Sequence, residues 1–258
     1  MNTLTIKGVS IGEGMPKIIV PLMGKTEKQI LKEAEAVKLL DPDIVEWRVD
    51  GFEKADDSEA VIKMISKLRE SLKDKLFLFT FRSHKEGGSK EMDVSSYIAL
   101  LEMAIRTKDI DFIDIELFSG EANVKALVSL AGENGVHVIM SNHDFQNTPA
   151  KDEIISRLRK MQELGAHIPK IAVMPKDTGD LLTLLDATYT MKTKYADRPM
   201  ITMSMAGTGL ISRLSGEIFG SACTFGAGEE ASAPGQIPVS ELRNVLEVLH
   251  KHTYTENR

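Results

Sequence analysis

Short runs of apolar and β-branched residues recur along the chain, with polar or glycine-containing stretches between them. Runs of this length and composition are typical of buried strands. They predict about eight strands, at residues 17–20, 43–49, 76–81, 112–117, 136–140, 169–173, 200–205 and 222–225.

Between these runs, apolar residues recur at spacings of three and four, which predicts amphipathic helices with one face to dock. The clearest cases are Val61, Ile65, Leu68 and Leu72, then Ile154, Leu158 and Met161, and finally Leu242, Val245, Leu246 and Leu249. Strict alternation of strand and helix requires crossover connections, so the sheet should be parallel. About eight such units favour a closed (β/α)₈ barrel over an open doubly wound sheet.

The segment before residue 17 alternates apolar and polar positions around two glycines, which predicts a small hairpin covering one end of the barrel. Its apolar positions are Leu4, Ile6, Val9 and Ile11. No linker, repeat or low-complexity stretch divides the chain, so residues 1–258 are expected to form a single domain.

Composition and charge limit the kinds of molecule that the protein is expected to bind. The 258 residues are 42% apolar and 27% charged, an ordinary globular balance. A net charge of −6 and the lack of basic runs argue against nucleic acid. Neither an apolar run of ~20 residues nor a signal-peptide pattern is present, so neither a membrane span nor export is expected. The one cysteine, Cys223, cannot form an intramolecular disulfide, which favours a reducing cytoplasm.

Charged residues within or just after buried parallel strands are the first functional signal, because such strands should be almost wholly apolar. Glu46 and Arg48 are two apart in the second strand and therefore share a face. Arg82 follows the third strand and His143 the fifth. All four lie near carboxyl ends of strands, where barrel enzymes keep their active sites.

Lys170 lies inside the apolar run of the sixth predicted strand. An amine that faces the barrel interior would be desolvated, which lowers its pKa and leaves a neutral nucleophile able to attack a carbonyl. A lysine at the start of a strand can instead extend to solvent, and the residues alone leave both interpretations open.

His143 could exchange protons near neutral pH, although a loop histidine is often incidental. Ser141 and Asp144 beside it suggest a Ser-His-Asp hydrolase, but the Gly-x-Ser-x-Gly elbow is absent. Glu86, which precedes two glycines, could orient a histidine or be a solvated loop acid.

Asp114 and Glu116 share a face of the fourth strand, where they could neutralise Lys170 or the arginines or make structural hydrogen bonds. They are left out of the catalytic set. The small residues at 226–236 suit a loop that closes over a ligand. No metal-ligand motif is recognisable, so no metal site is expected.

In their joint order, these motifs resemble the type I 3-dehydroquinate dehydratases over nearly the whole chain. The motifs are Glu-Trp-Arg-Val-Asp at 46–50, Thr-Phe-Arg at 80–82, Glu-Gly-Gly at 86–88, Met-Ser-Asn-His-Asp-Phe at 140–145, Pro-Lys-Ile-Ala at 169–172, Gly-Glu-Ile-Phe-Gly-Ser at 216–221 and Ser-Ala-Pro-Gly-Gln at 232–236. The resemblance implies a barrel without metal or organic cofactor that commonly forms a homodimer.

The resemblance also implies roles. Lys170 would form a Schiff base with the C3 ketone of 3-dehydroquinate, and His143 would act as general acid and base, oriented by Glu86, to give 3-dehydroshikimate. Arg213 would bind the substrate carboxylate. The other implied substrate contacts are Glu46, Arg48 and Arg82 for hydroxyls and charges, Ser232 and Gln236 from the closing loop, and Met203, Met205 and Phe225 as the apolar wall.

One position departs from the family pattern: Pro21 stands where members often have serine, so no side-chain hydrogen bond to substrate is expected there.

The sequence leaves two other functions open. A class I aldolase also uses a barrel lysine, and the run Ala-Gly-Thr-Gly at 206–209 leaves a phosphate-binding loop conceivable. A catalytically silent barrel that binds a small carboxylate is the other, and the joint presence of Lys170, His143 and Glu86 argues against it.

Overall fold

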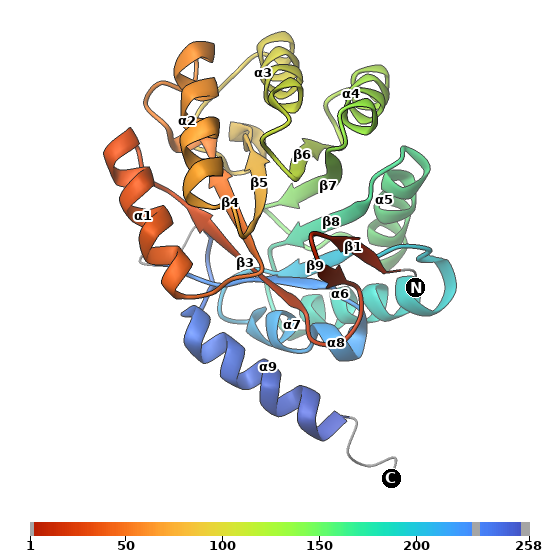
Figure 1. Cartoon of the computed structure of the whole chain (residues 1–258). Coiled ribbons are helices and arrows are strands. Elements are labelled where there is room, and N and C mark those ends of the chain that lie inside the picture. Colours follow the sequence, from red (N-terminus) through yellow and green to blue (C-terminus); the bar gives the residue numbers. More distant parts are fainter. Residues whose placement is uncertain (1–2, 229–232, 254–258) are drawn as a thin grey trace.

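Eight parallel strands form the inner wall of the computed structural model, which describes residues 3–228 and 233–253 (Figure 1). Their order is β10-β3-β4-β5-β6-β7-β8-β9, and a bridge between Met200 and Ser221 nearly closes the ring. The strands are β3 (Lys17–Leu22), β4 (Ile44–Arg48), β5 (Leu76–Thr80), β6 (Phe112–Glu116), β7 (His137–Asp144), β8 (Ile168–Val173), β9 (Ile201–Ser204) and β10 (Cys223–Phe225). The predicted (β/α)₈ barrel is confirmed.

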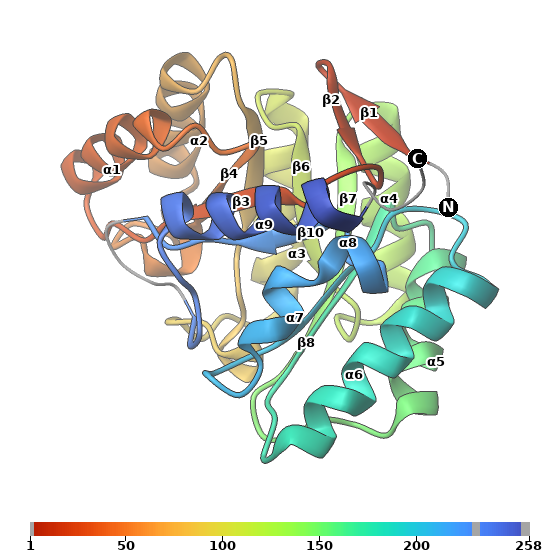
Figure 2. The ribbon, with the colours of Figure 1, turned by 90° about the horizontal axis from the view of Figure 1, so that it is seen from below.

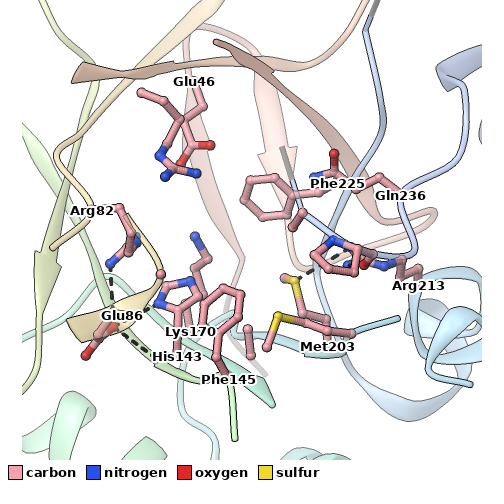
Figure 3. A pocket seen from close by; sticks show the side chains of 16 residues that line it. Glu46, Arg82, Glu86, His143, Phe145, Lys170, Met203, Arg213, Phe225 and Gln236 are labelled. Carbon is pink, nitrogen blue, oxygen red and sulfur yellow. Dashed lines mark hydrogen bonds and ion pairs between the residues drawn. The ribbon is translucent and has the colours of Figure 1, made fainter. Parts of the chain in front are cut away.

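Side chains alternate between the two faces of each strand, so one set packs under the helices and the other fills the barrel. In β4, Val45 and Trp47 pack in the outer core with helix residues such as Ile65. Ile44 packs in the inner core instead. Glu46 shares the face of Ile44, and this places its carboxylate inside the barrel (Figure 3).

Helices cover the outside of the barrel (Figure 1). They are α1 (Glu27–Leu39), α2 (Ser58–Ser71), α3 (Val94–Thr107), α4 (Glu121–Glu133), α5 (Lys151–Glu163), α6 (Thr178–Thr190), α7 (Leu210–Leu214), α8 (Gly216–Phe219) and α9 (Val239–Thr253), with the short turns η1 (Val49–Gly51), η2 (His84–Glu86) and η3 (Met191–Tyr195). None of the helices in the described ranges is long and apolar enough to cross a membrane.

The apolar face predicted for α9 is only partly correct. Leu242 and Leu246 are buried, but Val245 is 37% exposed. The buried stripe of the helix consists of Val239, Leu242 and Leu246, spaced three and four apart. Leu249 is half-buried, and Val245 lies at the side of this stripe. The faces predicted for α2 and α5 are buried as expected.

The predicted hairpin is present as β1 (Leu4–Ile6) and β2 (Val9–Ile11), which pair antiparallel (Figure 2). Lys7 and Gly8 at its turn both have positive φ, 47° and 82°, as a tight two-residue hairpin requires. Ile11 is fully buried in the inner core, and Lys7 forms an ion pair of 2.7 Å with Asp111, directly before β6. The hairpin therefore covers the amino ends of the strands and leaves the carboxyl ends open.

Candidate active site

A cavity of about 260 Å³ lies at the carboxyl ends of the strands (Figure 3). Every predicted site residue that the structure describes lines it, whereas Ser232 lies outside the described residues. Five further residues line the cavity, and all of them fall within the quoted motifs although no role was predicted for them: Gly87, Phe145, Ala172, Ala233 and Pro234. Their side chains are small or apolar, and such side chains do not indicate a chemical role by themselves.

Lys170 faces the interior of the barrel from β8 and is 3% exposed, so it does not extend to solvent. Its Nζ lies 3.5 Å from Oδ2 of Asp114 and 4.6 Å from the centre of the Phe225 ring. Burial lowers the pKa of Lys170, while the carboxylates of Asp114 and Glu46 oppose part of that shift. The site thus favours the neutral, nucleophilic amine more than water does.

His143 lies within β7, not after its end as predicted, because β7 continues pairing with β8 as far as Asp144. Its Nδ1 lies 2.9 Å from Oε2 of Glu86, and its backbone N–H donates to the same oxygen at 2.9 Å. Burial, then the positive charges of Arg82 and Lys170, hold the pKa of His143 well below its usual value. A neutral imidazole held at Nδ1 keeps Nε2 for proton transfer.

Glu86 is 7% exposed at the end of η2, so it is not a solvated loop acid. The amide of Asn142 donates to its Oε1 at 3.2 Å. Burial and then the charge of Glu116 raise the pKa of Glu86 to about 8. Gly87 follows with a φ of 85°, and any side chain there would overlap the Phe145 ring. The turn that presents Glu86 therefore requires glycine.

Arg82 is 3% exposed, and buried acceptors occupy both ends of its guanidinium. Nη2 donates to Asp114 at 2.7 Å, while Nη1 donates to Glu116 and to the Ser141 hydroxyl, both at 2.9 Å. Asp114 and Glu116, which were left out of the predicted catalytic set, therefore hold Arg82 in position without lining the cavity themselves. The sequence signals for them were their charge within a buried strand and their spacing of two in β6.

Glu46 and Arg48 both line the cavity, as their shared face predicted. Glu46 accepts a hydrogen bond of 2.8 Å from the Thr80 hydroxyl. Arg48 forms a bidentate pair with buried Asp50, at 2.8 and 2.9 Å. Both side chains are thus held before any ligand arrives, which reduces the entropy lost on binding.

Arg213, from α7, is 2% exposed and contacts no carboxylate among the described residues. Its Nη2 donates to the carbonyl of Pro234 at 3.1 Å, and Nη1 lies 3.8 Å from the Met203 sulfur. Its Nε finds no acceptor in the described part of the chain, and burial lowers its pKa to about 10. A buried cation left short of acceptors is a site for an anion.

The apolar wall expected from Met203, Met205 and Phe225 is present, since all three are buried and line the cavity. Pro21 pairs in register with Glu46 but lies beside a different hollow, with Met23. Cys223 is buried in β10.

Fold and site together define a barrel enzyme in which a lysine amine, a histidine and a buried arginine meet in one cavity. The model of the type I 3-dehydroquinase family matches residues 18–253. The 3-dehydroquinate dehydratase of Bacillus subtilis (strain 168) is 85% identical over 253 residues, which cover 98% of this chain and 99% of that protein. The chain belongs to the type I 3-dehydroquinase family, and it is a hydro-lyase of the shikimate pathway.

Two further relatives agree. The 3-dehydroquinate dehydratase of Salmonella paratyphi B is 56% identical and covers 97% of this chain and 100% of its own length. A solved type I 3-dehydroquinate dehydratase from Clostridium difficile, with covalently modified comenic acid, superposes with a TM-score of 0.95. It is 51% identical, with 97% of this chain and 99% of that chain covered. Family membership favours the dehydratase over the aldolase and the silent barrel.

Proposed function

We propose that this chain dehydrates 3-dehydroquinate through an imine on Lys170, with His143 moving the protons. The observation that carries the proposal is the amine of Lys170, 3% exposed in a cavity that also holds an imidazole. The neutral amine attacks the C3 carbonyl carbon, and a C–N bond forms. With one added proton, the carbonyl oxygen leaves as water, and the nitrogen keeps one proton as an iminium ion.

The iminium ion withdraws electrons, so the neighbouring C2–H bond becomes acidic. Nε2 of His143 accepts that proton, and the electron pair of the bond forms an enamine. The enamine then expels the C1 hydroxyl, which takes the proton back from His143 and leaves as water. Hydrolysis of the imine releases 3-dehydroshikimate and restores the amine of Lys170. Glu86 orients the imidazole throughout, through its 2.9 Å contact with Nδ1.

Substrate binding divides among the remaining residues. Arg213 binds the carboxylate, because its buried guanidinium lacks a carboxylate partner within the described chain. Glu46, Arg48 and Arg82 address the hydroxyls and charges of the ring, Gln236 and Ser232 close over it, and Met203, Met205 and Phe225 pack behind it. Local positive charge in a cavity can attract an anion despite the net charge of −6, since distant charges are screened.

We also propose that residues 1–258 form one catalytic domain that acts as a homodimer in the cytoplasm. The family match over residues 18–253 supports one domain. Leu182 and Tyr189, seven apart on α6, are 61% and 54% exposed, which supports a pairing surface on that helix. Sedimentation equilibrium tests the dimer. The single buried thiol of Cys223 fits a reducing compartment.

The experiment that tests the proposed function is reductive trapping. Borohydride added to enzyme and 3-dehydroquinate should reduce the imine to a stable secondary amine, and peptide mass spectrometry should place the added mass on Lys170. An enzyme that turns over without a trapped adduct, or that traps on another lysine, contradicts the proposal. Analysis of the products for carbon–carbon cleavage separates the dehydratase from an aldolase.

Replacing Arg213 by alanine should lower kcat/KM by roughly 10²-fold, the value of a charge-assisted pair of hydrogen bonds. The loss should appear mainly in KM, because the carboxylate is bound in both ground state and transition state. Steady-state kinetics with 3-dehydroquinate measure it. A ketone analogue without the carboxylate serves as control and should lose much less, and equal losses for both ligands would refute the assignment.

Glu86→Gln should lower kcat about tenfold, less than loss of the imidazole, because an amide oxygen can still accept from Nδ1–H. Burial raises the pKa of Glu86 to about 8, and its ionised form is a stronger acceptor of that hydrogen bond than its neutral acid. Wild-type kcat should therefore rise as the pH increases through 8, and the variant should lack this rise. A variant as inactive as His143→Ala would show that Glu86 does more than orient.

A further inference from the structure

The inner face of β6 places a second charged group against the proposed nucleophile. Asp114 is fully buried, and its Oδ2 lies 3.5 Å from Nζ of Lys170. The same oxygen accepts from Arg82 at 2.7 Å, and Oδ1 accepts from the Ser141 hydroxyl at 2.5 Å. Ser141 is the residue of β7 that lies directly opposite Lys170 in the sheet register. The carboxylate is therefore fixed in position relative to the amine.

Other charged groups face Lys170 from neighbouring elements, but among the described residues no other negative charge lies as close to Nζ as the carboxylate of Asp114. Among the described residues, Asp114 provides the carboxylate oxygen within 4.0 Å of Nζ. Its carboxylate also opposes the effect of burial on the pKa of Lys170 more strongly than that of Glu46 does. The remaining neighbours are Arg48 on β4, Arg82 after β5, His143 on β7 and the Phe225 ring on β10.

The proposed reaction makes two opposite demands on one nitrogen. The amine must be neutral to attack, yet the imine must be protonated to draw electrons from C2. Burial favours the neutral form in both cases, so burial alone would discharge the iminium ion and remove the electron sink. A bound ligand excludes water from the cavity. This increases the desolvation cost of the charged nitrogen, and it also strengthens the attraction between that nitrogen and a nearby carboxylate.

We propose that the buried carboxylate of Asp114 is the counter-ion of the iminium ion on Lys170, an inference that rests on the proposed function. Its distance of 3.5 Å suits an ion pair with the nitrogen, and Arg82 and Ser141 keep it from moving away. Replacing this charge by a neutral amide should weaken proton binding to the nitrogen. The iminium ion should then lose its proton at a lower pH. Formation of the imine should not be slowed, because a larger fraction of the free amine is also neutral.

The test is Asp114→Asn, which keeps the shape and removes the charge. Cyanoborohydride reduces iminium ions but not neutral imines, so the rate of trapping 3-dehydroquinate on Lys170 at each pH reports the protonated fraction. The pH at which trapping falls to half should be about 1–3 units lower in the variant than in the wild type. An unchanged midpoint in a folded variant would overturn the inference.

Glu116→Gln is the matched control. It removes another buried carboxylate from the same strand face, one that also bonds Arg82, at 2.9 Å. Glu116 acts on the pKa of Glu86 more strongly than Asp114 does, so this variant changes the acid–base pair without removing the carboxylate beside Nζ. Its trapping midpoint should match that of the wild type. A shift of the midpoint as large as that of Asp114→Asn would mean that the total charge of the cavity sets the pKa of the imine, and it would overturn the role of Asp114 as counter-ion.

A measurement on the wild type keeps the inference testable if Asp114→Asn does not fold. Enzyme labelled with ε-¹⁵N-lysine and saturated with 3-dehydroquinate should keep its imine protonated up to a pH within about one unit of that at which the butylamine imine of the same ketone loses its proton, because the carboxylate offsets burial. A midpoint lower by about 3 units or more, as burial without a counter-ion gives, would overturn the counter-ion. Absence of any adduct on wild-type Lys170 would instead overturn the proposed function, so the two failures are distinguishable.

Discussion

Lys170→Met is expected to keep the fold and to bind ligand while kcat falls on the order of 10⁵-fold to 10⁶-fold, the scale of removing a catalytic nucleophile. Methionine is apolar and of similar length, so it suits a strand position that is 3% exposed. Asp114 loses one partner but keeps Arg82 at 2.7 Å and Ser141 at 2.5 Å, so no buried carboxylate is left unpaired.

Three measurements check this expectation: steady-state turnover, ligand binding by calorimetry and thermal unfolding. Lys176→Met is the matched control, because Lys176 is exposed in the segment just after β8 and lies outside the cavity lining. That variant should retain wild-type kcat. Turnover near the wild-type value in Lys170→Met would exclude the covalent mechanism, whatever the trapping experiment reports.

His143→Ala is expected to lower kcat by roughly 10²-fold to 10⁴-fold, the usual contribution of a positioned acid–base group. The covalent adduct should accumulate at the same time. Lys170 can still form the imine, since its burial and its 3.5 Å contact with Asp114 do not depend on the imidazole. Proton removal from C2, loss of the hydroxyl and hydrolysis of the imine would all be slowed.

Intact-protein mass spectrometry of a quenched mixture with 3-dehydroquinate, without borohydride, measures the accumulated adduct. Slow appearance of the adduct fits the mechanism, because the histidine can also assist formation of the imine. Rapid turnover without a persistent adduct does not. His252→Ala, near the exposed end of α9, is the control and should behave as the wild type does.

The repeated spacing of the strands also explains how far the sequence alone could position the site. Glu46, Arg82, His143 and Lys170 each lie in or just after an apolar run, and parallel strands bring their carboxyl ends together. The end of the barrel that holds the chemistry could therefore be predicted from the sequence. The resemblance to the family then implied a role for Arg213, which lies outside the quoted motifs and has no strand context to reveal it.

What the sequence by itself determined is the alternation of strand and helix, the barrel, and the face on which each charged residue lies, because periodicity is a local property of the chain. Tertiary structure alone decided which charges meet. Glu86 contacts His143 across 57 positions of sequence, and Arg82 contacts Asp114 across 32. It also showed that Lys170 is buried and that Asp114 lies beside it. Such contacts depend on strand register and on barrel closure, which no local pattern encodes, and so do the pKa shifts that burial produces.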